Sequence, residues 1–467
     1  MKPVLLTTAL FALAGGSAFA QNSFPSDYQN TCGLDSSGFD AWFYSGSAAQ
    51  NGAVSPADGF TFPPIKNTDC DFYKWGAQMF LWLTSPAPGD DLVFDSPEFY
   101  DVVANAQGGF SFQQNSTEAA NLMSLRSVKA EDIGGTGQAG GSDVLISQKG
   151  SLNYYGIHTN DIYAQYLTGQ KTGKFTGTPI AENFPTTEAD MALIAAYVGH
   201  DLANPQAMTM ELKTSWVDAS TVDAAEFVTM KAQVPAYTKT SDTTWTRNGS
   251  ETLELALVGM HIVAPVNGHP ELVWISFEHI SNAPNAEFYY LNQQGTATSQ
   301  AYDSTGNWTF LPSGAAQPAA VTTVASVDSS GNITADKGST IVPVDVVQEN
   351  PWGNSPAETT EVESNTDLVS LNATVLGMLA KLGDVRGNYY QLGGIWTAEG
   401  QIPTSGTDAN IRGGLRLANS TMETFHQYPD TNNGFQSENC FTCHNVSSSS
   451  DGIKISHIFG GLSPLSK

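Results

Sequence analysis

A five-residue run close to the C-terminus constrains this chain more than any other feature: Cys440-Phe441-Thr442-Cys443-His444. Two thiols three positions apart, followed at once by a histidine, form the attachment pattern of a c-type haem. Each thiol can form a thioether with one vinyl group of the porphyrin, while the adjacent imidazole binds the iron as an axial ligand. The run therefore predicts one haem attached covalently to Cys440 and Cys443, with His444 as the proximal iron ligand.

Two other uses of a Cys-x-x-Cys pair fit the sequence less well. A zinc ribbon needs a second pair of ligands at matching spacing, and the chain has no other C-x-x-C. A thioredoxin-like redox motif follows a strand in a βαβ pattern, which the Asn- and Ser-rich surroundings of this pair do not suggest. Haem attachment is the interpretation that uses both thiols and the histidine.

Residues 1–20 have the three parts of a secretory signal peptide. Lys2 supplies the positive start, residues 4–14 form an apolar stretch, and Ala18-Phe19-Ala20 matches a small-x-small cleavage site. The apolar stretch is too short to span a bilayer, and no later one approaches the roughly 18 to 20 apolar residues of a transmembrane helix. We expect a mature protein that begins near Gln21 and is periplasmic or secreted, where c-type haem is attached in bacteria after export.

The remaining cysteines predict a disulfide. With Cys440 and Cys443 assigned to haem, Cys32 and Cys70 form a pair in an oxidising compartment, where disulfides persist. A disulfide that closes the loop between Cys32 and Cys70 stabilises a fold by ~3 to 4 kcal/mol on the chain-entropy model. The alternative is two buried free thiols.

The charge balance restricts the class of partner. Asp and Glu number 46 against 19 Lys and Arg, and the formal net charge is −27. Nucleic acids and anionic membranes bind basic patches, so neither is expected as a partner. A small basic redox partner protein would be attracted to such a surface. The alternative is that the acidity only keeps the protein soluble.

The pattern of apolar residues predicts a β-rich α+β fold. Spacings of three and four predict helices, and alternation predicts strands. The expected helices cover residues 71–83, 187–199 and 367–382. The expected strands cover residues 208–217 and 388–397, with a hairpin whose arms are 253–264 and 271–280. An Asn-Gly pair at the turn favours that hairpin.

We expect these elements in a large mixed body, residues 21–404, which begins with an irregular wrap over residues 21–70. Residues 292–345 are dense in Ser, Thr, Ala and Gly, which is typical of a flexible surface excursion. Residues 405–467 then form a C-terminal haem-binding segment packed on the body. A haem on so short a segment needs a second wall from the body, because its apolar perimeter must be kept from water.

Three separated motifs carry a resemblance to a known family. They are Ser276-Phe277-Glu278-His279 with Asn282-Ala283-Pro284, then Leu417-Ala418-Asn419-Ser420-Thr421-Met422-Glu423-Thr424, then the late C-x-x-C-H. From about residue 70 to the end, this combination resembles secreted bacterial monohaem proteins that are described as cytochrome c family proteins. The resemblance implies a haem protein of unassigned activity and brings no established substrate.

The sequence offers three main candidates for a second, distal iron ligand. His279 is the first choice and His261 lies on the opposite arm of the hairpin, because a strand holds a ligand more rigidly than a loop. His457 follows His444 closely enough to return over the haem. Alternation along the strand places Glu278 on the face opposite His279.

The iron's coordination separates two classes of function. With two axial ligands, the protein is a one-electron carrier that uses its single haem, which is the favoured reading. With an open axial site, it is a haem enzyme of peroxidase or oxygenase type, with a pocket in the body. A structural or sensory haem is a third possibility. The sequence indicates no catalytic residue.

Overall fold

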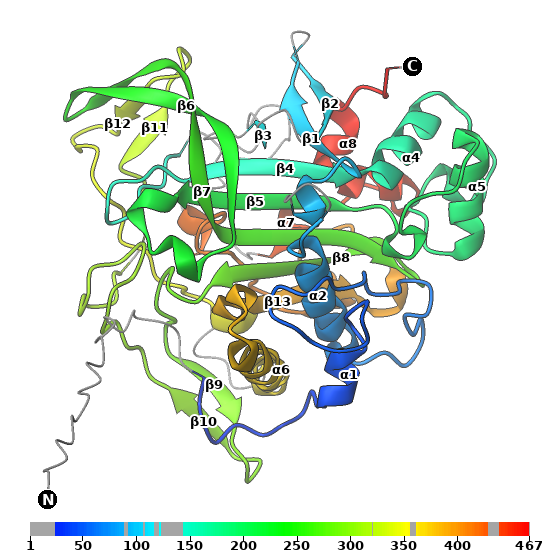
Figure 1. The fold of residues 1–467 in the computed structure, drawn as a ribbon, viewed down its shortest axis with the longest axis horizontal. Coiled ribbons are helices and arrows are strands. Elements are labelled where there is room, and N and C mark those ends of the chain that lie inside the picture. Colours follow the sequence, from blue (N-terminus) through cyan, green and yellow to red (C-terminus); the bar gives the residue numbers. More distant parts are fainter. Residues whose placement is uncertain are drawn as a thin grey trace, which may run out of the picture.

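The computed structural model describes most of the chain after the predicted signal peptide, which lies outside the described residues. The described ranges are 24–87, 92–105, 108–115, 121–122, 143–319, 321–354, 361–427 and 439–466. They form a β-rich α+β fold, as the sequence predicts, built around one large sheet (Figure 1).

The large sheet has the strand order β14-β13-β8-β7-β5-β4-β1-β2, with antiparallel neighbours throughout. Strands β3, β6, β11 and β12 join it off this path, and β9 pairs with β10 separately. The strand bounds are β1 (Phe99–Ala104), β2 (Phe110–Gln114), β3 (Asn121–Leu122), β4 (Tyr154–Asn160), β5 (Glu211–Asp218), β6 (Thr229–Ser241), β7 (Thr244–Val266), β8 (His269–His279), β9 (Phe288–Leu291), β10 (Ala297–Gln300), β11 (Ala325–Val327), β12 (Ile333–Ala335), β13 (Tyr389–Thr397) and β14 (Ile411–Gly413).

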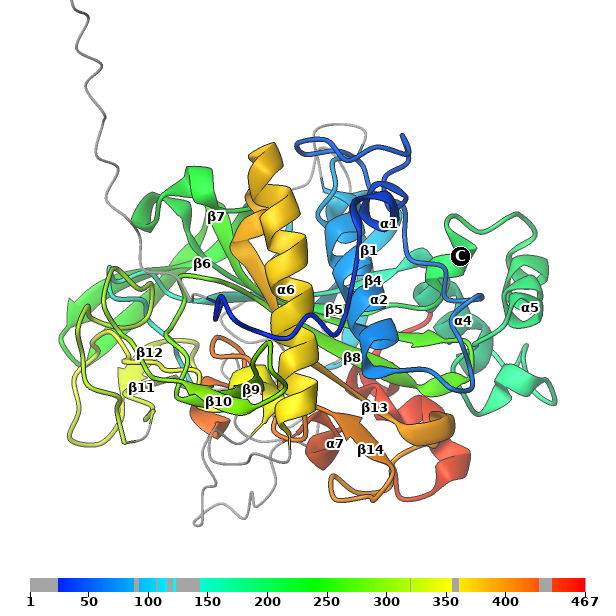
Figure 2. The same ribbon diagram turned by 90° about the horizontal axis from the view of Figure 1, so that it is seen from below.

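Helices cover both faces of the sheet. Their bounds are α1 (Ser36–Asp40), α2 (Asp69–Leu83), α4 (Asp161–Lys171), α5 (Glu188–Val198), α6 (Val362–Leu382), α7 (Cys440–Cys443) and α8 (His457–Gly461). Figure 2 shows α1 and α7 on opposite sides of the sheet, with α2 and α6 side by side on the α1 side. Within the described ranges, none of these helices combines the length and apolarity needed to cross a bilayer.

The predicted helices all form, with local signals at their ends. Thr187 and Asp190 make a reciprocal capping box that begins α5, and Gly199 ends it with a left-handed φ of 82°. Helix α2 begins at Asp69 through a second capping box, in which Thr68 precedes the helix. Helix α6 begins at Val362, five residues before the predicted start, and ends before Gly383 as expected.

The predicted hairpin also forms and is longer than expected. Strands β7 and β8 pair across Asn267 and Gly268, and Gly268 takes the positive φ of 81° that such a tight turn requires. Strand β7 starts at Thr244, because its first half pairs with β6. Its second half is bonded on both sides, by β5 and β8, and so forms the centre of the sheet.

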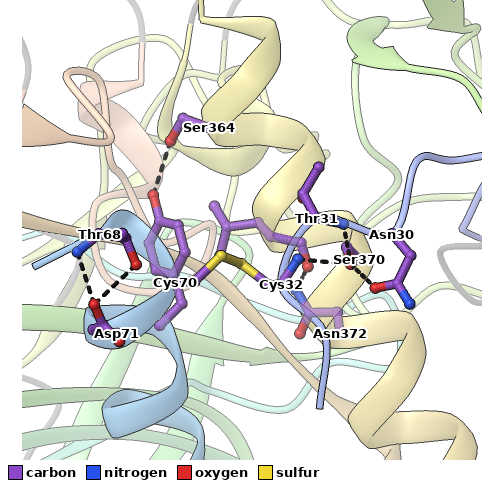
Figure 3. The surroundings of a disulfide bond; sticks show 11 residues. Asn30, Thr31, Cys32, Thr68, Cys70, Asp71, Ser364, Ser370 and Asn372 are labelled. Carbon is purple, nitrogen blue, oxygen red and sulfur yellow. Dashed lines mark hydrogen bonds between the residues drawn. A yellow bond between two sulfur atoms is a disulfide. The ribbon is translucent and has the colours of Figure 1, made fainter. Parts of the chain in front are cut away.

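The predicted disulfide joins the N-terminal wrap to the first long helix. Cys32 and Cys70 are bridged, with their Cα atoms 5.4 Å apart, and Cys32 is buried. The backbone N–H groups of Thr31 and Cys32 donate to the hydroxyl of Ser370 on α6 (Figure 3). The wrap is therefore held against α2 by a covalent bond and against α6 by hydrogen bonds.

Apart from residue 320, which lies outside the described ranges, residues 292–345 contain no regular elements except the short strands β10, β11 and β12, as the composition suggests. Part of this segment nevertheless packs into the body, because Trp308, Phe310 and Leu311 are buried. Phe310 lies in an apolar cluster with side chains of β5 and β7. The expectation of a flexible excursion is therefore wrong for these residues, which anchor the segment.

The C-terminal segment from residue 439 packs on the body at several separate points. Its backbone bonds include Val446 N–H to the carbonyl of Pro403 at 3.1 Å and Ser463 N–H to the carbonyl of Phe110 at 2.8 Å. The Lys171 ammonium group donates to the carbonyl of Gly460 at 2.9 Å. Its buried apolar side chains belong to the main core cluster and are Phe441, Val446, Ile455, Ile458, Phe459 and Leu462.

Candidate functional site

Helix α7 carries the two thiols of the motif. The Asn439 side chain caps this single turn by accepting a hydrogen bond from Phe441 N–H at 3.0 Å. Cys440 and Cys443 are three positions apart in it, which places them on one side of the turn. Both are free, half-buried thiols. Burial raises the pKa of each, and the Glu423 carboxylate adds to the effect, so both side chains are held as neutral thiols.

The His444 imidazole is held in a single tautomer. Its Nδ1 lies 3.0 Å from the carbonyl oxygen of Ile455, and a carbonyl oxygen can only accept, so Nδ1 carries the proton. The lone pair is therefore on Nε2, which has no hydrogen bond to any described residue. A backbone carbonyl on one ring nitrogen is the usual support for a histidine whose other nitrogen binds a metal.

Two rings fix the orientation of the His444 imidazole. The indole of Trp274 on β8 lies with its centroid 4.2 Å away at an angle of 47°. The His457 ring stacks on the other imidazole at 3.9 Å and 18°. Burial lowers the pKa of both histidines, so both are neutral, as an iron ligand must be. The body supplies one of these two walls, and the C-terminal segment supplies the other.

The structure brings His457 to the site but does not bring His279 there. His279 lies on the opposite face of the sheet from Trp274, because the two are an odd number of positions apart on β8. Its ring stacks on Phe227 at 3.7 Å, and both of its nitrogens are bonded, to Ser281 and to the carbonyl of Glu226. We therefore do not retain His279 as a distal ligand.

Two of the three motifs that carry the family resemblance, residues 276–284 and 417–424, contact each other. The Asn419 amide donates to the hydroxyl of Ser276 at 3.0 Å and to the carbonyl of Phe277 at 3.1 Å. The Ser420 hydroxyl and backbone N–H both donate to Glu278, which is 1% exposed and faces away from His279, as predicted. Burial raises the pKa of Glu278 to about 7. The motifs together form a buried polar junction that holds residues 417–424 on β8.

A second polar group, which we call the ionisable cluster, lies on the same face of the sheet and consists of Lys213, His261 and Glu423. Strand register places Lys213 of β5 opposite His261 of β7. The His261 Nε2 donates to both carboxylate oxygens of Glu423, each at 3.1 Å, and Lys213 Nζ lies 3.9 Å from one of them. These side chains are 14–18% exposed, so solvent reaches them.

The charges of the ionisable cluster reach the haem-binding motif. Burial acts to raise the pKa of Glu423, but the facing charges of His261 and Lys213 outweigh it and hold the value at about 2. The Glu423 and Lys213 charges both act on the Cys440 thiol and on the His444 imidazole. The cluster therefore lies close enough to any haem attached there to interact with it electrostatically.

Sequence reasoning named His261 only as an iron ligand and missed Lys213 and Glu423. The Nε2 of His261 is hydrogen-bonded to Glu423, so we do not retain His261 as a distal ligand either. A signal was present in β5, where Glu211 and Lys213 stand at alternate positions of a strand that is otherwise largely buried. Two charged side chains on one face of a central strand indicate a polar site, because unpaired buried charges are costly.

The side chains present fit covalent haem attachment and one axial ligand. They are two free thiols on one side of a turn and a neutral imidazole whose Nε2 is available. They do not form a pair of axial ligands, since two such imidazoles point nitrogen atoms at one iron from opposite sides of the porphyrin plane. His444 and His457 instead stack face to face, and the His457 Nε2 donates to the carbonyl of Cys443 at 3.1 Å.

Fold and site together define a β-rich α+β protein with a C-terminal Cys-x-x-Cys-His segment docked on its central sheet. A scan against protein-family models and searches of curated proteins and solved structures found no match to the chain. The resemblance to monohaem cytochrome c family proteins stays a prediction made from the motifs.

Proposed function

We propose that this is an exported protein that binds one haem covalently through Cys440 and Cys443, with His444 as axial ligand, and transfers single electrons. The observation that supports this best is the hydrogen bond from His444 Nδ1 to the carbonyl of Ile455. It leaves Nε2 unprotonated and without a hydrogen bond to any described residue, in a histidine that directly follows Cys443, the second of the two free thiols. A histidine that served only to stabilise the fold would be expected to use both nitrogens, as His158 and His269 do.

The chain's own residues would position and tune this site. Helix α7 presents both thiols on one side, and Trp274 holds the imidazole plane. The Ile455 carbonyl makes the His444 ring a stronger electron donor through the Nδ1 proton. Bound haem would supply a one-electron couple of the iron. Buried apolar side chains such as Phe441 would keep water away from part of it.

Export and the class of partner belong to the same proposal. The pattern of residues 1–20 supports secretion, and the Cys32–Cys70 disulfide is compatible with an oxidising compartment. A net charge of −27 favours a basic redox partner, with association that weakens as salt is added. We therefore propose a periplasmic or extracellular site of action.

Haem attachment is tested on protein produced with a c-type maturation system. After extraction with acidified acetone, the Soret band should remain with the polypeptide, and the mass should exceed that of the processed chain by one haem. Cys443→Ser should retain at most one thioether, and His444→Ala should mature poorly or give high-spin iron. Cys32→Ala/Cys70→Ala is the control and should keep covalent haem. Pigment that extracts away from the wild-type protein contradicts the proposal.

A second candidate function is a haem enzyme with an open axial position. The observation in its favour is that His457 is stacked on His444 and bonded to Cys443, which is not a ligating arrangement. Addition of carbon monoxide to the reduced protein separates the two functions. Fast binding indicates an open iron and an enzyme, whereas an unchanged low-spin spectrum indicates a carrier. In a carrier with His457 as second ligand, His457→Ala should convert the spectrum to high spin.

A further inference from the structure

Three side chains that can bind a metal ion meet at the disulfide. The sulfur atoms of Cys32 and Cys70 and a carboxylate oxygen of Asp367 all lie within 4.8 Å of one another. We propose that reduction of this disulfide creates a site for one divalent metal ion of the zinc class, held by the two thiolates and the Asp367 carboxylate. This site is separate from the haem-binding motif, and the proposal goes beyond the proposed function without depending on it.

The three ligands come from three parts of the fold. Cys32 lies in the N-terminal wrap, Cys70 lies in the first turn of α2, and Asp367 lies in the second turn of α6 (Figure 3). The side chain of Thr31 is hydrogen-bonded to the Asp367 carboxylate and so helps to orient it. Cys32 is buried, whereas Cys70 and Asp367 are partly exposed, so an ion can enter from solvent. A metal bound here would tie the wrap to both helices.

The spacing and the types of atom suit zinc. With Zn–S bonds of about 2.3 Å and a Zn–O bond of about 2.0 to 2.2 Å, the ligand atoms of a tetrahedral site lie roughly 3.5 to 4 Å apart. The Cα atoms of Cys32 and Cys70 are 5.4 Å apart, so side-chain rotation can bring the freed sulfurs to this separation. Thiolates select zinc over Mg²⁺ and Ca²⁺, which require oxygen ligands. Three protein ligands leave the fourth position to water.

The charges around the site also favour a cation. The Asp69 and Asp367 carboxylates repel each other, and the Glu363 carboxylate acts on Asp367 in the same direction. Lys74 acts on Asp367 and Arg412 acts on Asp69, and both favour the ionised carboxylate that a metal requires. Two thiolates would leave the reduced site with a surplus of negative charge. A divalent cation offsets this surplus.

The conversion is balanced by a dithiol reductant. The reductant gives two electrons and two protons to the disulfide, whose S–S bond breaks to leave two thiols, and it forms a disulfide of its own. The metal ion then replaces both thiol protons, which leave to solvent. Oxidation of the thiolates releases the metal ion and closes the disulfide again. The wrap is therefore held to α2 in either state, by a covalent bond or through the metal.

The test uses the full-length chain with Cys440→Ser and Cys443→Ser, in which Cys32 and Cys70 are the only cysteines. The protein is reduced with a dithiol, which is then removed under argon, and Co²⁺ is added as a coloured substitute for zinc. Reduced protein should bind one Co²⁺ per chain, with a thiolate-to-cobalt absorption band that added Zn²⁺ abolishes. Oxidised protein should show no such band. Zn²⁺ should also raise the melting temperature of the reduced form only.

A matched pair of variants tests the third ligand. Asp367→Asn removes the carboxylate and should weaken Co²⁺ binding roughly tenfold or more. Glu363→Gln removes an exposed charge from the same helix and should bind as the parent protein does. Absence of the band from protein with two titratable thiols overturns the proposal. Equal affinities in Asp367→Asn and Glu363→Gln also overturn it, because the thiols of an unfolded chain would bind without Asp367. Neither result affects haem attachment, which is measured on the covalent Soret band of the wild-type protein.

Discussion

Single residues in this protein carry charge in unusually buried places, and Glu278 is the clearest case. It is 1% exposed and accepts hydrogen bonds from Ser420 and Asn282. Burial raises its pKa from 4.5 to about 7, because water no longer stabilises the carboxylate. The charge of the Glu278 side chain therefore changes with pH near neutrality, and with it the strength of the hydrogen bonds that join residues 276–284 to residues 417–424.

This shift predicts a measurable dependence of stability on pH. Between the unfolded pKa of 4.5 and the folded pKa of about 7, the unfolded chain has released the Glu278 proton and the folded chain keeps it. The free energy of unfolding therefore falls as pH rises through this window. Glu278→Gln cannot ionise, so relative to wild type it should gain roughly 1 to 3 kcal/mol across the window, measured by urea unfolding.

The comparison with wild type and one control variant isolate the contribution of Glu278. Burial also raises the pKa of Glu211 to about 7, but Glu211 is present in both proteins and cancels from the difference. Glu254→Gln replaces an exposed glutamate of β7. The difference between its free energy of unfolding and that of the wild type should not depend on pH. Parallel curves of unfolding free energy against pH for wild type and Glu278→Gln would contradict the assignment.

At the scale of elements, strand register decides which side chains can act together. The pairing of β7 with β8 places His261 opposite Ser276, on the face that carries Trp274 and Glu278. His279 follows Glu278 by one position and so faces the other way. The sequence analysis named His279 as the first choice of distal ligand and His261 as another candidate, both because they lie on strands. The register of β7 with β8, which includes a bulge between Ala264 and Val266, places the two histidines on opposite faces of the sheet.

The disulfide gives a prediction about the elements that it joins. Cys32→Ala/Cys70→Ala should lower the free energy of unfolding by ~2 to 4 kcal/mol, because the unfolded chain loses its cross-link. Residues 24–68 should also be cleaved faster by protease, since they lose their covalent tie to α2. The haem spectrum should stay unchanged, because α2 and α7 lie on opposite faces of the sheet.

Reduction of the wild-type protein is the matched comparison and should give the same loss of stability. Peptide mapping without reductant should recover Cys32 and Cys70 in one linked fragment. Full labelling of both thiols in unreduced, denatured protein would rule the disulfide out.

For the molecule as a whole, the site is shared between the body and the C-terminal segment. Trp274 of β8 covers one side of the His444 ring. The Ser456 hydroxyl, next to His457, donates to Glu211 of β5 at 2.6 Å and pairs with the Tyr163 hydroxyl of α4 at 2.8 Å. Removal of the body would expose these contacts to water and release the ring.

An isolated fragment of residues 405–467 should therefore fail to reproduce the site. We expect little covalent haem, or haem with an altered spectrum and potential, because Trp274 and the sheet face are missing. Full-length protein matured in parallel is the control. A fragment that matures with the wild-type spectrum and potential would show that the body is not required.

The sequence alone was enough for features that depend on neighbours along the chain. These are the helix predicted over residues 187–199, the Asn-Gly hairpin turn and the pairing of Cys32 with Cys70. Each follows from local backbone geometry, or from a count of thiols in an oxidising compartment.

Only the tertiary structure decided how those features combine into a site. Lys213, His261 and Glu423 come from three distant parts of the chain, and strand register with packing of the C-terminal segment brings them together. The same packing brings Trp274 to His444 and keeps His279 away. Such contacts depend on which face of the sheet each side chain occupies, and a shift of one residue reverses every face.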